Sequence, residues 1–217
     1  MDKPVLKLNL GCGPVTPAGW INIDGSNRAI LASKLWLIDK LLVRLGFLPP
    51  TEFGRHVRIC NLFKPLPFAD NSVKHIYAGE LWEHFELEDG ERLTKECYRV
   101  LKPGGVLRIC VPDGESFWRK YLELLDQFKQ LPEAERQSPK QVQHHVQMYF
   151  RDICTRKTTL GSMGHFHKWQ YDEIQLINQF ESCGFTNVER SQYRKSRIDD
   201  VHLVERSDFL IIEGVKE

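Results

Sequence analysis

The sequence contains no long apolar run and no concentrated basic segment. No stretch of its 217 residues approaches the roughly 20 apolar residues that cross a membrane, and its start lacks the basic segment and apolar core of a signal peptide. The 30 basic and 29 acidic residues nearly cancel. Because phosphate binding needs a concentrated positive face, this balance argues against nucleic acid as a partner. We therefore expect a cytoplasmic protein that does not bind nucleic acid.

Paired cysteine spacings are also absent. The six cysteines are scattered without any CxxC spacing, at Cys12, Cys60, Cys97, Cys110, Cys154 and Cys183. Such scatter predicts small buried apolar residues in a reducing compartment, and neither a disulfide framework nor a zinc site. Internal repeats and low-complexity segments are missing too. With 41% hydrophobic residues, the chain is expected to form one α/β domain over residues 1–217.

A short apolar strand that runs into a glycine turn opens the chain. Residues 5–10 are followed at once by Gly11-Cys12-Gly13-Pro14, and a second strand over residues 20–23 ends in Asp24. A buried parallel strand leading into a glycine turn is typical of nucleotide-binding sheets. Glycines let a ligand lie against main-chain atoms because no Cβ stands in the way. Asp24 is placed to accept hydrogen bonds from two ribose hydroxyls.

Four segments in this order resemble the class I S-adenosylmethionine-dependent methyltransferases. Residues 5–24 resemble their first motif with its ribose-binding acid, and residues 66–73 (LPFADNSV) resemble their LPF-x-D-x-S-F segment. Glu83-His84 resembles their EH pair, and residues 99–105 match the R-V-L-K-P-G-G turn. The resemblance implies a methyltransferase that uses S-adenosylmethionine and releases S-adenosylhomocysteine.

The fold implied by this resemblance is α/β. It is a three-layer, Rossmann-like, seven-stranded and mostly parallel sheet with an antiparallel last strand. Helices are expected over 28–48, 88–101 and 171–183, and the later strands over 56–60, 73–78, 106–111, 185–190 and 209–212. The two glycines before residue 106 are expected to end the second helix with left-handed backbone. The insertion at 114–168 lies where the family places the acceptor site, so we expect it to be a helical substrate cap.

The resemblance also assigns the cofactor contacts. They are expected at Asn9, Gly11, Cys12, Gly13, Asp24, Asn61, Leu62, Gly79 and Glu80. Asn61 stands where the family usually has an aspartate that accepts from the adenine amino group, and its side-chain carbonyl can accept the same bond. Asn9 stands where many relatives carry an acid. We therefore expect somewhat weaker cofactor binding than in those relatives.

Histidines are the candidates for taking a proton from a hydroxyl acceptor, because a base with a near-neutral pKa suits that task. By position we select His165, His84 and His167 as catalytic candidates. Two other interpretations stay open: Glu83-His84 only fixes its loop, and the later histidines only pack. A metal cluster would use the four histidines of the insertion, which are His144, His145, His165 and His167. We expect no bound metal.

The acceptor is expected to be a small molecule or a sugar of a surface glycan. No Asn-Pro-Pro-Tyr stretch is present, which argues against enzymes that methylate adenine or glutamine nitrogens with that motif. A nicotinamide oxidoreductase would normally show G-x-G-x-x-G, but here the third glycine is missing, Pro14 occupies the turn and the spacing to the acid Asp24 is shorter. A protein that binds S-adenosylmethionine without catalysis stays an alternative, because Asn9 and Asn61 replace acids.

Residues 28–48 are expected to form one amphipathic helix. Its wide apolar face, from Ile30 to Leu45, should lie in the core. The opposite face carries Trp36 and Val43 among polar residues. Trp36 either packs on the following loop or makes a contact, as part of a homodimer, a lid over the substrate or a weak attachment to a membrane surface.

Overall fold

The computed structural model describes residues 5–48, 56–136 and 167–217. Its strands are β1 (Leu6–Leu10), β2 (Ile21–Asp24), β3 (Arg58–Ile59), β4 (Val73–Gly79), β5 (Leu101–Val111), β6 (Thr186–Arg190) and β7 (Leu210–Val215). Its α-helices are α1 (Asn27–Lys34), α2 (Trp36–Arg44), α3 (Leu87–Val100), α4 (Gly114–Gln130), α5 (Glu133–Arg136) and α7 (Glu173–Ser182). Two short 3₁₀ helices are η1 (Trp82–His84) and η3 (Val201–Leu203).

The seven strands form one sheet in the order β3-β2-β1-β4-β5-β7-β6. All neighbours from β3 to β5 are parallel, whereas β7 runs antiparallel to both β5 and β6. The strand order reverses between β1 and β4, where Leu10 pairs with Ala78. In an open parallel sheet, ligands bind at the carboxyl ends of the strands on either side of such a reversal. The predicted seven-stranded, Rossmann-like fold is confirmed.

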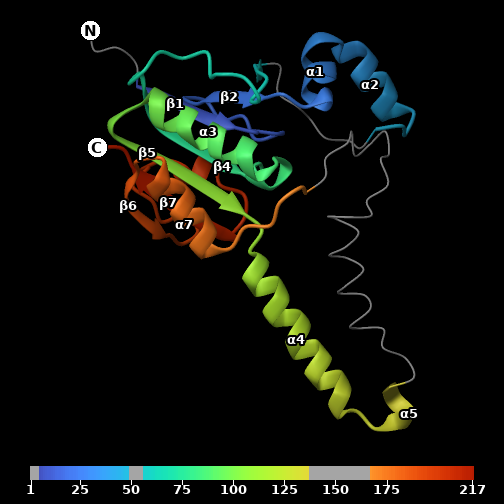
Figure 1. Cartoon of the computed structure of the whole chain (residues 1–217). Helices are drawn as coiled ribbons and strands as arrows, with labels where there is room; N and C mark the ends of the chain where they lie inside the picture. The colour runs from blue at the N-terminus through green and yellow to red at the C-terminus, as the bar shows by residue number, and fades with distance from the viewer. Residues whose placement is uncertain (1–4, 49–55, 137–166) are drawn as a thin grey trace.

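Different elements cover the two faces of the sheet. α3 and α7 lie on one face (Figure 1), where Leu93 and Phe180 pack with Ile76 of the sheet in the main core. On the other face, Tyr77 packs with Val201 of η3 in a second cluster of buried side chains. The strands are apolar on both sides because both faces are covered.

The region 28–48 forms two helices, so the expectation of one continuous helix is wrong. The break falls at Leu35, whose φ of −129° and ψ of 45° lie outside the helical region. It allows the buried side chains of Arg28 and Asp39 to form an ion pair of 3.1 Å. In one straight helix these residues would lie about 16 Å apart along the axis.

The apolar side of α2 is on the surface and not in the core, which corrects a second expectation. Exposed fractions of its apolar side chains reach 65% at Leu37 and 54% at Leu41. Trp36 is 37% exposed, and the Lys40 ammonium lies 5.3 Å from its ring centre. A homodimer or membrane-surface contact through 28–48 stays a prediction.

The segment after α3 differs from the expected helix stop. α3 ends at Val100, and Leu101 is already extended, so β5 begins there. Gly104 has the expected left-handed backbone with φ of 73°. Gly105 does not, and it is needed for a close approach, because a Cβ there would lie 2.7 Å from the Lys102 carbonyl oxygen. The register between β4 and β5 shifts at this point, so the glycines form a bulge within the strand.

Other predicted elements are confirmed with smaller changes. β3 is shorter than the expected strand over 56–60. In α7, Leu176 and Phe180 are buried as expected, but Ile174 is 73% exposed. The described ranges contain no helix that is both long enough and apolar enough to span a membrane.

The described part of the insertion is helical. α4 starts where β5 ends and points away from the sheet, and the short α5 follows (Figure 1). The α4 side chains of Trp118 and Leu122 are exposed. Residues 137–166 of the expected cap, including Cys154, lie outside the described residues. A role of 114–168 over the acceptor stays a prediction.

Candidate functional site

The glycine turn after β1 has the backbone conformation that its sequence predicts. Gly11 and Gly13 have φ values of 63° and 52°, which side chains with a Cβ rarely adopt. A Cβ on Gly11 would also lie 2.9 Å from the Leu81 side chain. The Cys12 amide between them donates to the Ile23 carbonyl over 3.0 Å, which ties the turn to β2. The Cys12 thiol is buried, and burial raises its pKa to about 12.

Asp24 lies at the end of β2 and holds two backbone segments together. Its carboxylate accepts from the Gly13 amide over 2.9 Å and from the Ser26 amide over 2.8 Å. Only 7% of its surface is exposed. Each carboxylate oxygen has a further lone pair, so both can accept a second bond.

Two of the expected site residues support loops through their amide groups. Asn9 is buried, and its Nδ2 donates to the Val15 carbonyl over 2.9 Å and to Asn22 over 3.0 Å. It therefore lies beneath the glycine turn. Asn61 is exposed, and its Oδ1 accepts from the Phe63 amide over 2.9 Å.

The segment around Asn61 lies beside Asp24. A Cβ on Gly25 would lie 2.5 Å from the Cys60 carbonyl oxygen, so the two chain segments touch through their main chains. Leu62 is buried with 6% exposure. The carboxyl ends of β2 and β3 therefore place Asp24, Asn61 and Leu62 at one edge, as the sequence predicts.

Arg206 is a candidate site residue that the sequence analysis missed. Its guanidinium crosses the carboxyl ends of β1 and β4, donating to the carbonyls of Gly79 over 2.8 Å, Gly11 over 3.2 Å and Cys12 over 3.4 Å. Beside it, the exposed Glu80 accepts from Ser207 over 2.8 Å. Glu80 has a left-handed φ of 55°, which is uncommon without glycine and marks a constrained turn.

A buried charge cluster supports the segment that carries Arg206. Arg108 of β5 is fully buried, and its Nε donates to Glu205 over 2.8 Å while Nη1 donates to Glu213 over 3.1 Å. It also donates to the carbonyls of Gln192 and Lys195. These bonds hold the chain between β6 and β7 against the sheet, directly before Arg206.

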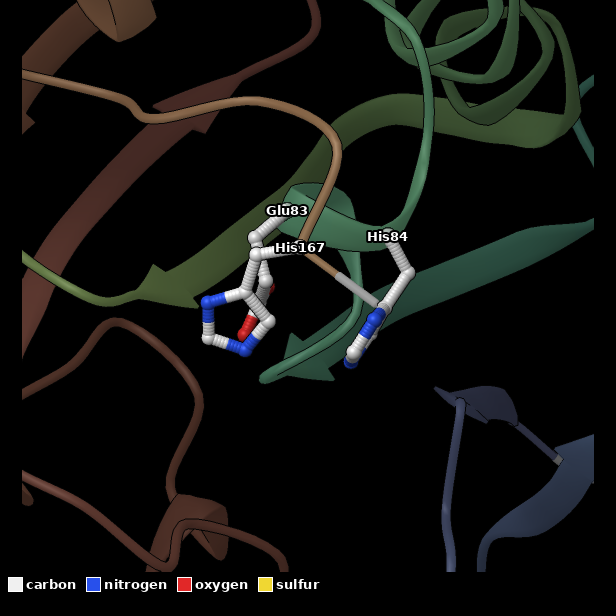
Figure 2. A group of neighbouring side chains, drawn as sticks. All are labelled: Glu83, His84 and His167. Carbon is white, nitrogen blue, oxygen red and sulfur yellow. The ribbon is translucent and has the colours of Figure 1, made fainter. Parts of the chain in front are cut away.

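A second group lies where β4 continues into η1. Glu83 and His84 are consecutive residues of η1, and His167 comes from the segment that precedes α7. The His84 and His167 ring centroids are 5.1 Å apart at 77°. Figure 2 shows the Glu83 carboxylate next to the His167 ring, with His84 on the neighbouring side.

The Glu83 side chain is buried with an incomplete set of partners. Only 1% of it is exposed, and its Oε2 accepts no hydrogen bond in the described part of the chain. The pKa of this carboxyl is raised to about 8, mainly by burial and also by the nearby Glu80 charge, while the Arg206 charge opposes the shift. Its backbone carbonyl accepts from Lys168 over 2.7 Å and from Trp169 over 3.2 Å, which fixes His167 beside it.

The structure thus brings together two of the three catalytic candidates. His84 and His167 are in contact, whereas His165, His144 and His145 lie outside the described residues. The sequence motif Glu83-His84 indicated this place. No motif marks Arg206, because its segment is joined to the glycine turn only by tertiary packing.

The residues at this edge fit the expected cofactor. The Gly11 and Gly79 carbonyls already accept from a cationic group, and an amino-acid ammonium needs the same acceptors. The Asp24 carboxylate offers acceptors for hydroxyl groups nearby. This edge therefore suits both S-adenosylmethionine and its product S-adenosylhomocysteine.

Comparisons with known proteins agree with S-adenosylmethionine as the cofactor. Residues 8–109 match a family model described as a methyltransferase domain. No curated protein matches the sequence. Among solved structures, a SAM-dependent methyltransferase of Thermotoga maritima, described as a possible histamine N-methyltransferase, has a TM-score of 0.52 at 16% identity, with 100% of this chain and 84% of that chain covered.

Two further structures have similar scores. A SAM-dependent methyltransferase of Methanosarcina mazei has a TM-score of 0.51 at 16% identity, covering 100% of this chain and 94% of that chain. The Haemonchus contortus phosphoethanolamine N-methyltransferase 2, in complex with phosphomonomethylethanolamine and S-adenosylhomocysteine, has a TM-score of 0.51 at 15% identity. This chain, covered over 100%, spans 49% of that protein. The methyltransferase domain matched over residues 8–109 and the shared fold support a class I S-adenosylmethionine-dependent methyltransferase.

Proposed function

We propose that this methyltransferase acts on a small molecule, including sugar acceptors, at the carboxyl edge of β1 and β4. The observation that carries this proposal is the arrangement around the strand reversal. There the glycine turn, Asp24 and Arg206 lie at one edge, and Glu83, His84 and His167 lie beside them. The first group suits the cofactor, and the second suits an acceptor.

The cofactor is proposed to bind across the glycine turn. Asp24 would accept from the ribose hydroxyls, and Asn61 with Leu62 would border the adenine. Gly11 and Gly79 would present their carbonyls to the ammonium group, with Cys12, Gly13 and Glu80 lining the same turn. Asn9 would support the glycine turn indirectly, because its side chain donates a hydrogen bond to the Val15 carbonyl. When bound, the cofactor supplies a methyl group on a positively charged sulfur.

On the acceptor side, His84 and His167 are proposed to receive the reacting group. Both are half-buried, so their rings can meet a ligand without unfolding of η1. One of these two histidines would take the proton from the acceptor. His165 also stays a candidate for this base. The solved structures described above include proteins whose names refer to histamine and to phosphomonomethylethanolamine. These descriptions refer to small molecules and support the same acceptor class here.

Methyl transfer to defined acceptors tests the proposal. The protein would be incubated with S-adenosylmethionine and separate pools of small amines, hydroxylated aromatics and sugars, and methylated products would be detected by mass spectrometry. We expect transfer to a member of these pools by the wild-type protein, and less transfer by Asp24→Ala at the same subsaturating cofactor concentration. Preferential methylation of a protein or nucleic acid would contradict the proposed acceptor class.

A further inference from the structure

We propose that Glu83, His84 and His167 form a binding site for a divalent metal ion of the zinc class. One ligand atom from each of these residues lies within 4.8 Å of the others. The three side chains converge on one place between η1 and the segment before α7 (Figure 2). This site differs from the expected histidine cluster of the insertion and from the expectation of a metal-free protein.

The donor set is one that transition metals prefer. Two neutral imidazoles and one carboxylate bind Zn²⁺ in catalytic sites, where a fourth position stays open for water or substrate. Ligand atoms around a tetrahedral zinc ion lie about 3.4 Å apart, given bonds of about 2.1 Å. Because the three ligand atoms lie within 4.8 Å of one another, ion binding would require the half-buried His84 and His167 side chains to rotate closer to Glu83.

The unpaired Glu83 oxygen independently points to a ligand. A polar atom that is removed from water normally has a hydrogen-bond partner, and one without a partner costs free energy. Oε2 of Glu83 is buried and accepts no hydrogen bond within the ranges that the structure describes. A cation at this position would supply the missing interaction for a side chain that is 1% exposed.

The fold holds the ligands from two distant parts of the chain. η1 fixes the first two residues, because the His84 amide donates to the Leu81 carbonyl over 3.1 Å. The Glu83 carbonyl accepts from Lys168 over 2.7 Å, directly after His167. These backbone bonds hold the three ligand residues next to one another.

An ion here would act on the acceptor, and this role rests on the proposed function. A metal ion lowers the pKa of a bound oxygen group by stabilising its negative charge. An acceptor hydroxyl in the open coordination position would lose its proton more easily, and the proton would pass to water. The site then favours an oxygen acceptor over an amine.

Metal binding to the full chain tests the site without any acceptor. The protein would be freed of metal by a chelator and dialysed, and then titrated with Zn²⁺ by calorimetry and with Co²⁺ by visible absorption. We expect one ion per chain and Co²⁺ bands that Zn²⁺ removes. His84→Gln, His167→Gln and the isosteric Glu83→Gln should each weaken Zn²⁺ binding by roughly tenfold or more.

The control is His202→Gln, which changes an exposed histidine of η3 and should leave Zn²⁺ affinity unchanged. Circular dichroism and the affinity for S-adenosylhomocysteine establish that each variant is folded. Lack of Zn²⁺ binding by the folded wild-type protein would overturn the metal site. So would Zn²⁺ affinity that survives all three substitutions, because the ion would then be bound elsewhere. Neither result affects the cofactor site, which S-adenosylhomocysteine binding reports separately.

Discussion

Arg206 donates a hydrogen bond to the carbonyl of Gly79 over 2.8 Å. Gly79 ends β4, and Arg206 belongs to the segment between η3 and β7, so two parts of the chain that are far apart in sequence meet at the strand reversal. The same guanidinium nitrogen reaches the Gly11 carbonyl at the end of β1. The described residues thus present a fixed positive charge to any ligand of the glycine turn.

Removal of this charge should weaken binding of S-adenosylhomocysteine. An amino-acid ligand brings an ammonium group for the glycine carbonyls and a carboxylate for the guanidinium of Arg206. Arg206→Ala should therefore cost about 1.5 kcal/mol or more, roughly a tenfold loss of affinity. Arg206→Lys should lose less, because it keeps the charge.

Calorimetry with two ligands checks this prediction. Methylthioadenosine lacks the amino-acid group, so its affinity should be the same in wild type and Arg206→Ala. Tighter binding of S-adenosylhomocysteine by Arg206→Ala would contradict the prediction, since it would mean that Arg206 competes with the ligand's ammonium group.

Asp24 should matter for both cofactor binding and stability. Asp24→Ala removes the acceptor for two backbone amides and for the proposed ribose hydroxyls, so it should weaken S-adenosylhomocysteine binding by roughly 1.5–3 kcal/mol and lower the melting temperature. Asp24→Asn keeps one acceptor oxygen, so its affinity and its melting temperature should lie between those of the wild-type protein and Asp24→Ala. Calorimetry and thermal unfolding measure the two effects. Normal affinity in a folded Asp24→Ala protein would exclude the ribose contact.

The buried Arg108 should be among the most sensitive positions for stability. Arg108→Leu removes the buried positive charge that pairs with the carboxylates of Glu205 and Glu213, so the free energy of unfolding should fall by roughly 3–5 kcal/mol. Urea denaturation measures this loss. Arg197→Leu provides a matched control, because its bond to Glu213 comes from a side chain that is 36% exposed, and it should cost about 1 kcal/mol or less. Equal losses in the two variants would contradict the prediction.

His75 should make the protein less stable in mildly acidic solution. Burial lowers the pKa of this imidazole below 6.5, and the charges of Lys74 and Lys7 add to the effect against the opposing Asp200 and Asp199. Below pH 6.5 the unfolded chain therefore binds more protons than the native state, and the free energy of unfolding falls as the pH drops.

His75→Gln removes this contribution. Urea denaturation of both proteins between pH 5 and pH 8 should give a smaller loss of stability at low pH for the variant. Parallel pH profiles would contradict the prediction. The site histidines are unchanged in both proteins, so the difference reports His75 alone.

The sheet could be predicted from sequence because each strand carries its own local pattern. Residues buried on both faces produce short apolar runs, and the runs ending in Gly11 and Gly79 are of this type. Asp24 was predicted at the site because it follows such a run directly. The carboxyl ends of parallel strands share one edge of the sheet, so the position of Asp24 directly after its strand was enough to predict its place at that edge.

Helical patterns alone were a weaker guide at 28–48. An apolar stripe predicts a buried face, but the stripe of α2 is exposed, and the break at Leu35 is stabilised by the ion pair of Arg28 with Asp39. The energy of that contact depends on burial, which no local pattern records. Gly104 shows the same limit, since a bulge and a helix stop both use left-handed glycine.

The sequence by itself determined the order of the elements, the glycine turn and the family, because these depend on residues close together in the chain. Only the tertiary structure decided that Arg206 reaches Gly79 and that His167 lies beside Glu83. Each of these pairs joins segments that lie far apart along the chain. Their meeting depends on how the helices and loops pack around the sheet, and that packing follows from the summed burial of many side chains.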